Sequence, residues 1–198
     1  MTIEEGEKER NISKRARAVF IDRDGTINED KVYLGDVRNL EIIPGAVEAV
    51  KLLKKEGFLT FIITNQSGLA RGLFGPEDLE RIHDKIRENF PLDGIYYCPH
   101  HPDEDCPCRK PKPKMLLDVA DKFQVDLKTS YFIGDALSDI ELGQRAGCKS
   151  ILVLTGKGKE TEALLRERGT PAEFVAGDIL EAAKWIKKVE SVKLKVEG

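Results

Sequence analysis

Short apolar runs recur along the chain, separated by longer amphipathic stretches. The clearest runs, residues 18–22 and 58–64, are continuous and rich in β-branched and aromatic side chains. This pattern is typical of strands that are buried on both faces. Weaker runs of the same kind predict four more strands, at residues 94–97, 130–134, 150–154 and 173–175.

The stretches between these strands have helical periodicity. Apolar residues recur every three or four positions between Gly45 and Gly57 (Ala46, Ala49, Val50 and Leu53). Pro76 and the two acidic residues after it are typical of a first helical turn. Further helices are expected at residues 114–123, 139–146, 160–168 and 178–188. Because strands and helices alternate, we predict an α/β fold in which a Rossmann-like parallel sheet lies between two helical layers, a three-layer α/β/α architecture.

The length of 198 residues suits one compact domain, which we place at residues 17–188. Residues 1–16 are polar and lack periodicity, so they are expected to form a flexible N-terminal extension. Residues 189–198 are expected to be a C-terminal tail. Within that tail, Val and Leu alternate with Lys from residue 191 onwards, which predicts a marginal strand or disorder.

Composition narrows the possible partners. The formal net charge is -3, and 34% of the residues are charged, which argues against a nucleic-acid-binding surface. No apolar stretch is long enough to span a membrane, and the charged N-terminal segment is unlike a secretory signal. We therefore expect a cytoplasmic protein that binds neither nucleic acid nor membrane. A monomer that acts on a small molecule is a further expectation.

Two carboxylates follow the first predicted strand. Asp22 and Asp24 lie two residues apart before a glycine, so in an extended chain both side chains point to one face. A carboxylate such as Asp22 is ionised at neutral pH and can act as a nucleophile once a bound Mg²⁺ offsets its repulsion of a phosphate group. Asp24 is the candidate proton donor and acceptor. The alternative is that both acids only stabilise turns.

Other polar residues end the neighbouring strands. Thr64 ends the second strand and precedes Asn65, Gln66 and Ser67, while Asp135 follows the strand at 130–134. The carboxyl ends of parallel strands meet at one edge, so these residues should lie near the acid pair. Asp135 is the candidate third Mg²⁺ ligand, and Asp139 is placed to hold a metal-bound water or a lysine.

A basic segment carries Arg109 and Lys110, which we expect to neutralise a transferring phosphoryl group. The next cations, Lys112 and Lys114, also fit an ordinary solvated loop. Near the acid pair, the amides and hydroxyls of residues 64–67 would complete a site for a phosphate.

A cluster of cysteines predicts a second metal site. Three thiols and an imidazole within eleven residues fit a closed tetrahedral zinc site that orders its loop, with ligands Cys98, His100, Cys106 and Cys108. His101 is an alternative to His100. Outside the cluster, Cys148 is expected to be a packed apolar residue, and His83 is expected to lie on the surface of its helix.

These motifs, in this order, resemble those of the haloacid dehalogenase (HAD) superfamily of phosphatases. The closer resemblance, over residues 18 to 188, is to the D-glycero-D-manno-heptose-1,7-bisphosphate 7-phosphatase family. It rests on the sequences DRDGTIN at residue 22, TNQSGLARG at 64, YCPHHP at 97, CPCRKP at 106, IGD at 133 and LTG at 154.

The resemblance implies a HAD-type fold with a minimal cap and an aspartyl-phosphate intermediate on Asp22, with Asp24 as general acid and base. It implies Mg²⁺ bound by Asp22, Asp135 and the backbone carbonyl of Asp24. The transferring group would be stabilised by Thr64, Arg109 and Lys110. The implied substrate-binding residues are Asp30, Lys31, Val32, Tyr33, Thr64, Asn65, Gln66, Ser67, Arg109 and Lys110.

Three alternatives remain open at this point. The first is a histidinol-phosphate phosphatase, because the zinc loop has the spacing seen in that related family. Ala136 also stands where some relatives carry a lysine near the substrate. The TNQSG sequence also resembles polynucleotide 3′-phosphatases, although the acidic balance of the chain argues against that substrate. A non-catalytic phosphate-binding module is disfavoured because both acids of the pair are present.

Overall fold

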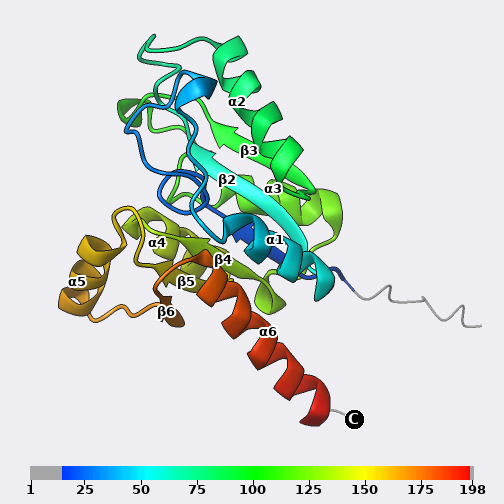
Figure 1. Cartoon of the computed structure of the whole chain (residues 1–198). Coiled ribbons are helices and arrows are strands. Elements are labelled where there is room, and N and C mark those ends of the chain that lie inside the picture. The colour runs from blue at the N-terminus through cyan, green and yellow to red at the C-terminus, as the bar shows by residue number, and fades with distance from the viewer. Residues whose placement is uncertain (1–14, 197–198) are drawn as a thin grey trace, which may run out of the picture.

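The computed structural model describes the backbone of residues 15–196, with side chains up to Val192. Six strands form one parallel sheet in the order β3-β2-β1-β4-β5-β6 (Figure 1). The strands are β1 (Ala18–Ile21), β2 (Leu59–Asn65), β3 (Gly94–Cys98), β4 (Tyr131–Gly134), β5 (Lys149–Val153) and β6 (Phe174–Ala176). All six predicted strands are confirmed, each displaced by no more than one residue at either end.

Helices cover both faces of this sheet. One face packs against α1 (Ala46–Lys55), α2 (Pro76–Asn89) and α6 (Ile179–Val196), and the other against α3 (Lys114–Phe123) and α4 (Leu137–Ala146), with α5 (Gly158–Arg168) beside α4. A hydrophobic core lies on each face of the sheet, and alternate residues of β1 point into each. Val19 and Ile21 pack on the α1 side, and Ala18 and Phe20 pack on the α3 side. The predicted three-layer α/β/α architecture is therefore confirmed.

The strand order places the candidate site. The chain reverses its direction of progress across the sheet at β1, which lies between β2 and β4. In open parallel sheets, ligands bind beyond the carboxyl ends of the strands at such a switch point. Ile21 pairs with Ile133 in adjacent strands, so Asp22 and Asp135 emerge close together. The connection from β1 to α1 holds only loop and the short 3₁₀ helix η1 (Val37–Asn39), which leaves the crevice without a cap domain.

The C-terminal segment differs from expectation. α6 runs through Val196, so the prediction of a marginal strand or disorder from residue 191 is wrong over residues 191–196. No Gly or Pro interrupts residues 179–196, and nothing in the sequence ends the helix at Lys188. Glu190 of this helix is buried, accepts a 2.6 Å hydrogen bond from the Tyr131 hydroxyl and pairs with Arg17. Residues 197–198 lie outside the described residues.

Most of the expected N-terminal extension, residues 1–14, also lies outside the described residues. Ala16 is attached to the domain, because its N–H donates to the Gln124 carbonyl at 3.0 Å and its carbonyl accepts from the Asp126 N–H at 2.8 Å. Within the described part of the chain, no helix is both long enough and apolar enough to cross a membrane.

Candidate active site

Asp22 lies at the carboxyl end of β1 and is 6% exposed. Its Oδ1 is 2.5 Å from the Nζ of Lys110, which is itself 5% exposed. The same ammonium lies 2.7 Å from Asp139 Oδ1 and donates to the Ile63 carbonyl at 3.1 Å. Lys110 is therefore fixed between two carboxylates, and Asp139 holds a lysine, as one of its two predicted roles requires.

Three buried carboxylates crowd this position. Oxygen atoms of Asp22, Asp135 and Asp139 lie within 4.8 Å of one another. Burial, together with the charge of Asp139, raises the pKa of Asp22 and raises that of Asp135 to about 6. The charge of Lys110 offsets only part of this repulsion. A hard divalent cation with oxygen ligands supplies the missing positive charge, so the donor set fits Mg²⁺.

Asp24 has different surroundings. Its carboxylate accepts two hydrogen bonds from the Arg23 guanidinium, at 2.9 and 3.1 Å, one from Asn28 at 3.0 Å and one from Gln66 at 2.9 Å. Burial alone would raise the pKa of Asp24, but the charge of Arg23 and these hydrogen bonds outweigh it and lower the pKa. Two carboxylates two residues apart thus occupy opposite environments, which is typical of paired catalytic acids.

The end of β2 connects the acid pair to the basic segment. Gln66 donates to the Thr64 hydroxyl at 2.8 Å as well as to Asp24, and its backbone N–H donates to the Cys98 carbonyl. Asn65 accepts a hydrogen bond from the Lys110 N–H at 3.1 Å and donates to the Lys110 carbonyl at 3.4 Å. The polar residues after β2 therefore hold the backbone of Lys110 as well as facing the acids.

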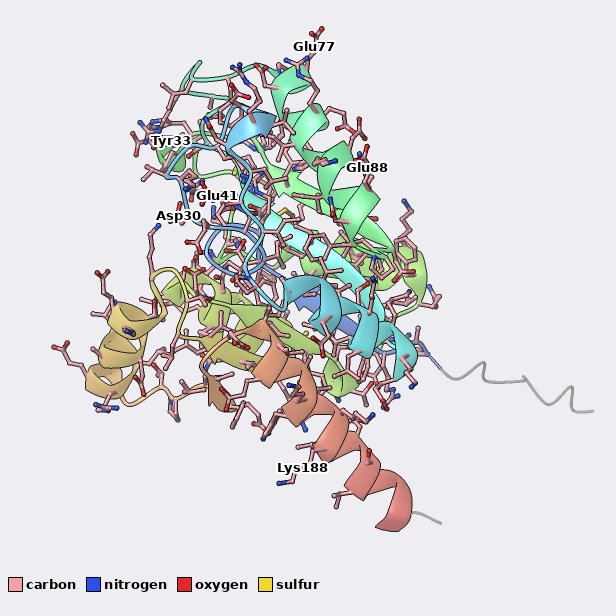
Figure 2. The ribbon with its side chains drawn as sticks, viewed as in Figure 1. Asp30, Tyr33, Glu41, Glu77, Glu88 and Lys188 are labelled. Carbon is pink, nitrogen blue, oxygen red and sulfur yellow. The ribbon has the colours of Figure 1, made fainter. Side chains whose placement is uncertain are left out.

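A cavity of about 290 Å³ opens above these groups. Most of the predicted site residues line it: Asp22, Asp24, Asp30, Val32, Tyr33, Thr64, Asn65, Ser67, Arg109, Lys110 and Asp135. In Figure 2, Asp30 and Tyr33 lie on the loop that follows β1, far from Lys188 on α6.

Two residues predicted to bind substrate do not line this cavity. Lys31 pairs instead with Glu41 at 3.0 Å, and Gln66 is buried beneath the cavity floor. Three lining residues are absent from the prediction, Ala136, Ser138 and Lys157. Ala136 and Ser138 follow Asp135 directly, so proximity in sequence is a signal for them. Lys157 follows the LTG sequence at the end of β5.

The basic segment is divided by the structure. The Arg109 Nη1 atom is buried, has no hydrogen-bond partner among the described residues and belongs to a side chain that lines the cavity, so it can receive an anion. Lys112 and Lys114 point away and pair with Asp105 and Asp118 on the surface, at 2.5 and 2.8 Å. The interpretation as a solvated loop holds for Lys112, whereas Lys114 is solvated but is the first residue of α3.

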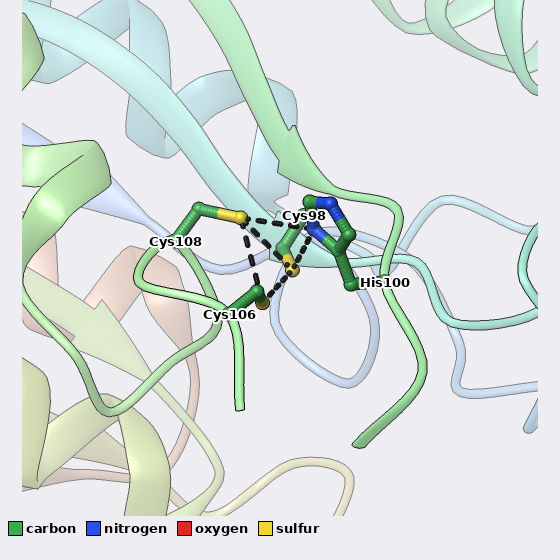
Figure 3. Close-up of side chains that lie close together, drawn as sticks. All are labelled: Cys98, His100, Cys106 and Cys108. Atoms are coloured by element: carbon green, nitrogen blue, oxygen red, sulfur yellow. Dashed lines mark hydrogen bonds between the residues drawn. The ribbon is translucent and has the colours of Figure 1, made fainter. Parts of the chain in front are cut away.

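The sulfur atoms of the cysteine cluster converge as predicted (Figure 3). The three Sγ atoms are separated by 3.3 to 3.6 Å, and the His100 Nδ1 atom lies 3.6 Å from Cys98 Sγ and 3.2 Å from Cys108 Sγ. A tetrahedral zinc ion with Zn–S near 2.3 Å and Zn–N near 2.05 Å has edges of about 3.6 to 3.8 Å, which are within about half an ångström of these separations. The four donors, Cys98, His100, Cys106 and Cys108, fit zinc.

The second histidine of the segment has a different role. The His101 Nδ1 atom accepts a hydrogen bond from the Asp103 N–H at 3.3 Å and caps the short 3₁₀ helix η2 (Pro102–Glu104). His100 is thus the histidine of the cluster. Cys148 is buried in the core on the α3 face, as predicted.

His83 contradicts the prediction that it lies on the surface. It is 1% exposed, packs on the Tyr97 ring with centroids 5.4 Å apart, and has its pKa lowered to about 3 by burial and by the charge of Arg23. The sequence shows the helical position of His83 but not the Tyr97 ring against which it is buried.

Comparison with known proteins agrees with this geometry. Residues 107–182 match the model of a family described as HAD-hydrolase-like. The chain is 38% identical over 190 residues to the D-glycero-beta-D-manno-heptose-1,7-bisphosphate 7-phosphatase of Escherichia coli strain K12, a match that covers 89% of this chain and 97% of that protein. The chain belongs to this family of HAD phosphatases. The Photorhabdus laumondii phosphatase of the same name is 41% identical over 185 residues, which is 86% of this chain and 97% of that protein.

A solved member of the heptose phosphatase family has the same fold. The crystal structure of D,D-heptose 1,7-bisphosphate phosphatase from B. bronchiseptica, complexed with magnesium and phosphate, superposes with a TM-score of 0.80 at 36% identity. The match covers 87% of this chain and 98% of that chain. The HAD-type fold predicted from the motifs is therefore confirmed.

Proposed function

We propose that the protein is a Mg²⁺-dependent phosphatase that removes the 7-phosphate of D-glycero-β-D-manno-heptose 1,7-bisphosphate. The observation that carries this proposal is the near full-length match to enzymes named for that reaction. The DRDGT, TNQSG and CRKP sequences of this chain contribute residues to one cavity, which supports it. The β anomer is proposed because the relatives are named for it. A small phosphorylated sugar is the expected substrate class.

In the first step, a carboxylate oxygen of Asp22 attacks the phosphorus atom. The bond from phosphorus to the sugar oxygen breaks, and an aspartyl phosphate forms on Asp22. Lys110, 2.5 Å from Asp22, and the unpaired Nη1 of Arg109 are placed to balance the charge of the transferring group. The Thr64 hydroxyl, oriented by Gln66, lines the same cavity and supplies a hydrogen bond.

Asp24 moves the protons. In its protonated form it donates to the leaving sugar oxygen, and as the carboxylate it then takes a proton from the water that hydrolyses the aspartyl phosphate. The lowered pKa of Asp24 favours the carboxylate in the free protein, and the charge of an incoming phosphate opposes that effect. The hydrogen bonds from Arg23 and Gln66 keep the carboxylate directed into the cavity.

Both metals have residues to hold them. Asp22, Asp135 and the backbone carbonyl of Asp24 would bind Mg²⁺, which neutralises the carboxylates and the phosphate when bound. The cysteine cluster would hold zinc in a closed structural site, and four such ligands need a reducing compartment, so we also propose a cytoplasmic location. We further propose a monomer that binds no nucleic acid.

The test is phosphate release with Mg²⁺ from the β and α anomers of the heptose 1,7-bisphosphate and from histidinol phosphate, compared by kcat/KM. The β anomer is expected to exceed the α anomer and to exceed histidinol phosphate by at least 100-fold. A preference for histidinol phosphate would overturn the heptose assignment and would make the spacing of the zinc loop the feature that determines the substrate.

A further inference from the structure

Lys157 lies at the start of α5, on a loop that is fixed to the catalytic strands. Its backbone N–H donates to Asp135 Oδ2 at 2.7 Å, and the Thr155 hydroxyl donates to the Gly25 carbonyl at 2.6 Å. The loop therefore has a defined position relative to both β1 and β4. These two hydrogen bonds fix the backbone of Lys157 next to Asp135, a candidate metal ligand, so the Lys157 side chain extends from a fixed position.

The Lys157 side chain lines the cavity without being needed by the fold. It is 63% exposed, and its Nζ lies 3.0 Å from Oδ2 of Asp30, which also lines the cavity. A lysine ammonium is positively charged at neutral pH, so Lys157 places a positive charge beside Asp30 in the lining of the cavity.

A bisphosphate needs more positive charge than the reacting position provides. Four carboxylates and three cations line the cavity. Lys110 is engaged by Asp22 and Asp139, and Arg109 is assigned above to the transferring group. A second phosphate monoester brings a further charge of about −1.5 to −2. Among the described residues that line the cavity, Lys157 is the remaining cation.

We infer that Lys157 is a specificity-determining residue that exchanges its ion pair with Asp30 for the non-reacting phosphate of a bisphosphate substrate. This inference rests on the proposed function and deepens it, because it assigns the distal 1-phosphate to a residue of this chain. Asp30, once released, is free to accept a hydrogen bond from a sugar hydroxyl.

The exchange is favourable on electrostatic grounds. Asp30 offers a single charge, and exposed ion pairs of this kind are weak. A phosphate offers more charge and three acceptor oxygens, and a sugar that fills the cavity removes water from around the ammonium. Discrimination by Lys157 is therefore expected between substrates that differ only in the distal phosphate.

The experiment compares two substrates with the same reacting group, D-glycero-β-D-manno-heptose 1,7-bisphosphate and the corresponding heptose 7-phosphate. For Lys157→Gln, the ratio of kcat/KM for the bisphosphate to that for the 7-phosphate should fall at least tenfold from the wild-type ratio, mainly through a higher KM for the bisphosphate. Lys157→Arg retains the charge and should restore at least half of the loss on a logarithmic scale.

Lys187→Gln is the matched control. Lys187 forms a similar half-exposed ion pair, 3.1 Å from Glu56, but on α6, away from the cavity. For Lys187→Gln, the ratio of kcat/KM for the bisphosphate to that for the 7-phosphate should equal the wild-type ratio. A wild-type ratio in Lys157→Gln, or the same loss in Lys187→Gln, would overturn the assignment of Lys157 while leaving the proposed function in place. Failure of the wild type to hydrolyse either heptose phosphate would overturn the proposed function, and this inference with it.

Discussion

At the scale of single residues, the site separates two aspartates by their neighbours. Asp22 and Asp24 are chemically identical, yet burial with other acids raises the pKa of Asp22, whereas the Arg23 guanidinium and two amides lower that of Asp24. Arg23 achieves this from a position that is only 1% exposed. The two aspartates for which we propose the roles of nucleophile and proton carrier therefore lie in opposite electrostatic surroundings.

Replacing the proposed nucleophile tests its role directly. Asp22→Asn removes the attacking charge but keeps the shape of the side chain, so kcat should fall by at least about 1,000-fold. The fold should persist, because the change also relieves crowding among three buried acids. Phosphate release and thermal unfolding measure the two effects. Asp118→Asn, an exposed acid on α3, is the control, and Asp22→Asn with normal turnover would contradict the aspartyl-phosphate mechanism.

The carboxylate cluster also predicts a pH dependence of stability without Mg²⁺. The pKa of Asp135 in the folded state, about 6, lies above the ordinary 3.8, so the folded state binds the proton more tightly. Its contribution to stability is complete below pH 4 and is lost as the pH rises through 6; the difference corresponds to roughly 3 kcal/mol. Mg²⁺ should restore stability at pH 7.

This prediction is best measured as a difference between two proteins. Urea unfolding of wild type and Asp135→Asn, in Mg²⁺-free buffer from pH 4 to 7, should show the wild type losing stability relative to the variant as pH rises. His83, with a pKa near 3 in the folded state, changes protonation equally in both and cancels. A constant difference across this range would show that Asp135 is not in a crowded site.

At the scale of elements, the loop between β3 and α3 depends on its four metal ligands for its structure. The loop has few apolar side chains of its own to bury, and its cysteine sulfurs pack against the core on the α3 side of the sheet. The segment leads directly from Cys108 to Arg109 and Lys110, and Gln66 hydrogen-bonds the Cys98 carbonyl at its other end. We therefore expect bound zinc to fix the position of Arg109 and Lys110.

Cys106→Ser tests this coupling. Loss of one ligand should reduce the bound zinc to well below one ion per chain and lower the melting temperature by several degrees. KM should rise in the same variant. Zinc content, thermal unfolding and steady-state kinetics are the measurements. Cys148→Ser, at a buried cysteine outside the cluster, should retain full zinc. An unchanged zinc content and melting temperature in Cys106→Ser would contradict the structural role of the metal.

The sequence predicts those elements and residues whose signals are local. Apolar runs identify the strands, and the acid pair, the strand ends and the cysteine spacing identify most residues of both metal sites. Lys157, by contrast, pairs with an acid that lies far away in the sequence, on the loop after β1, and His83 is buried against Tyr97 of β3. The sequence does not predict that α6 extends beyond residue 188, because alternating Val and Lys fits a strand as well as a half-exposed helix.

At the scale of the whole molecule, α6 connects the two ends of the described chain. Glu190, 8% exposed, joins α6 to Tyr131 of β4 and to Arg17, the residue before β1. α6 also packs beside α1 on one face of the sheet, against β5 and β6 (Figure 1). Residues near the C-terminus thus stabilise the two strands that carry Asp22 and Asp135.

Glu190→Ala should therefore lower stability without altering the chemistry. It leaves the Arg17 guanidinium and the Tyr131 hydroxyl without this acceptor, so the free energy of unfolding should fall by about 2 kcal/mol. Urea unfolding measures the loss, and kcat of the folded enzyme should stay at the wild-type value. Glu88→Ala, an exposed acid on α2, should change stability by less than about 0.5 kcal/mol. Equal effects would show that the Glu190 contacts contribute nothing.

The position of β1 in the sheet has a consequence for synthesis on the ribosome. β1 emerges among the first elements, yet one of its two neighbours, β4, is made only after β2, β3 and the cysteine loop. At translation rates of about 5–20 residues per second, one edge of a fully apolar strand waits several seconds for its partner. During that interval the nascent chain is a natural client for chaperones, and the enzyme's yield in a cell will depend on them.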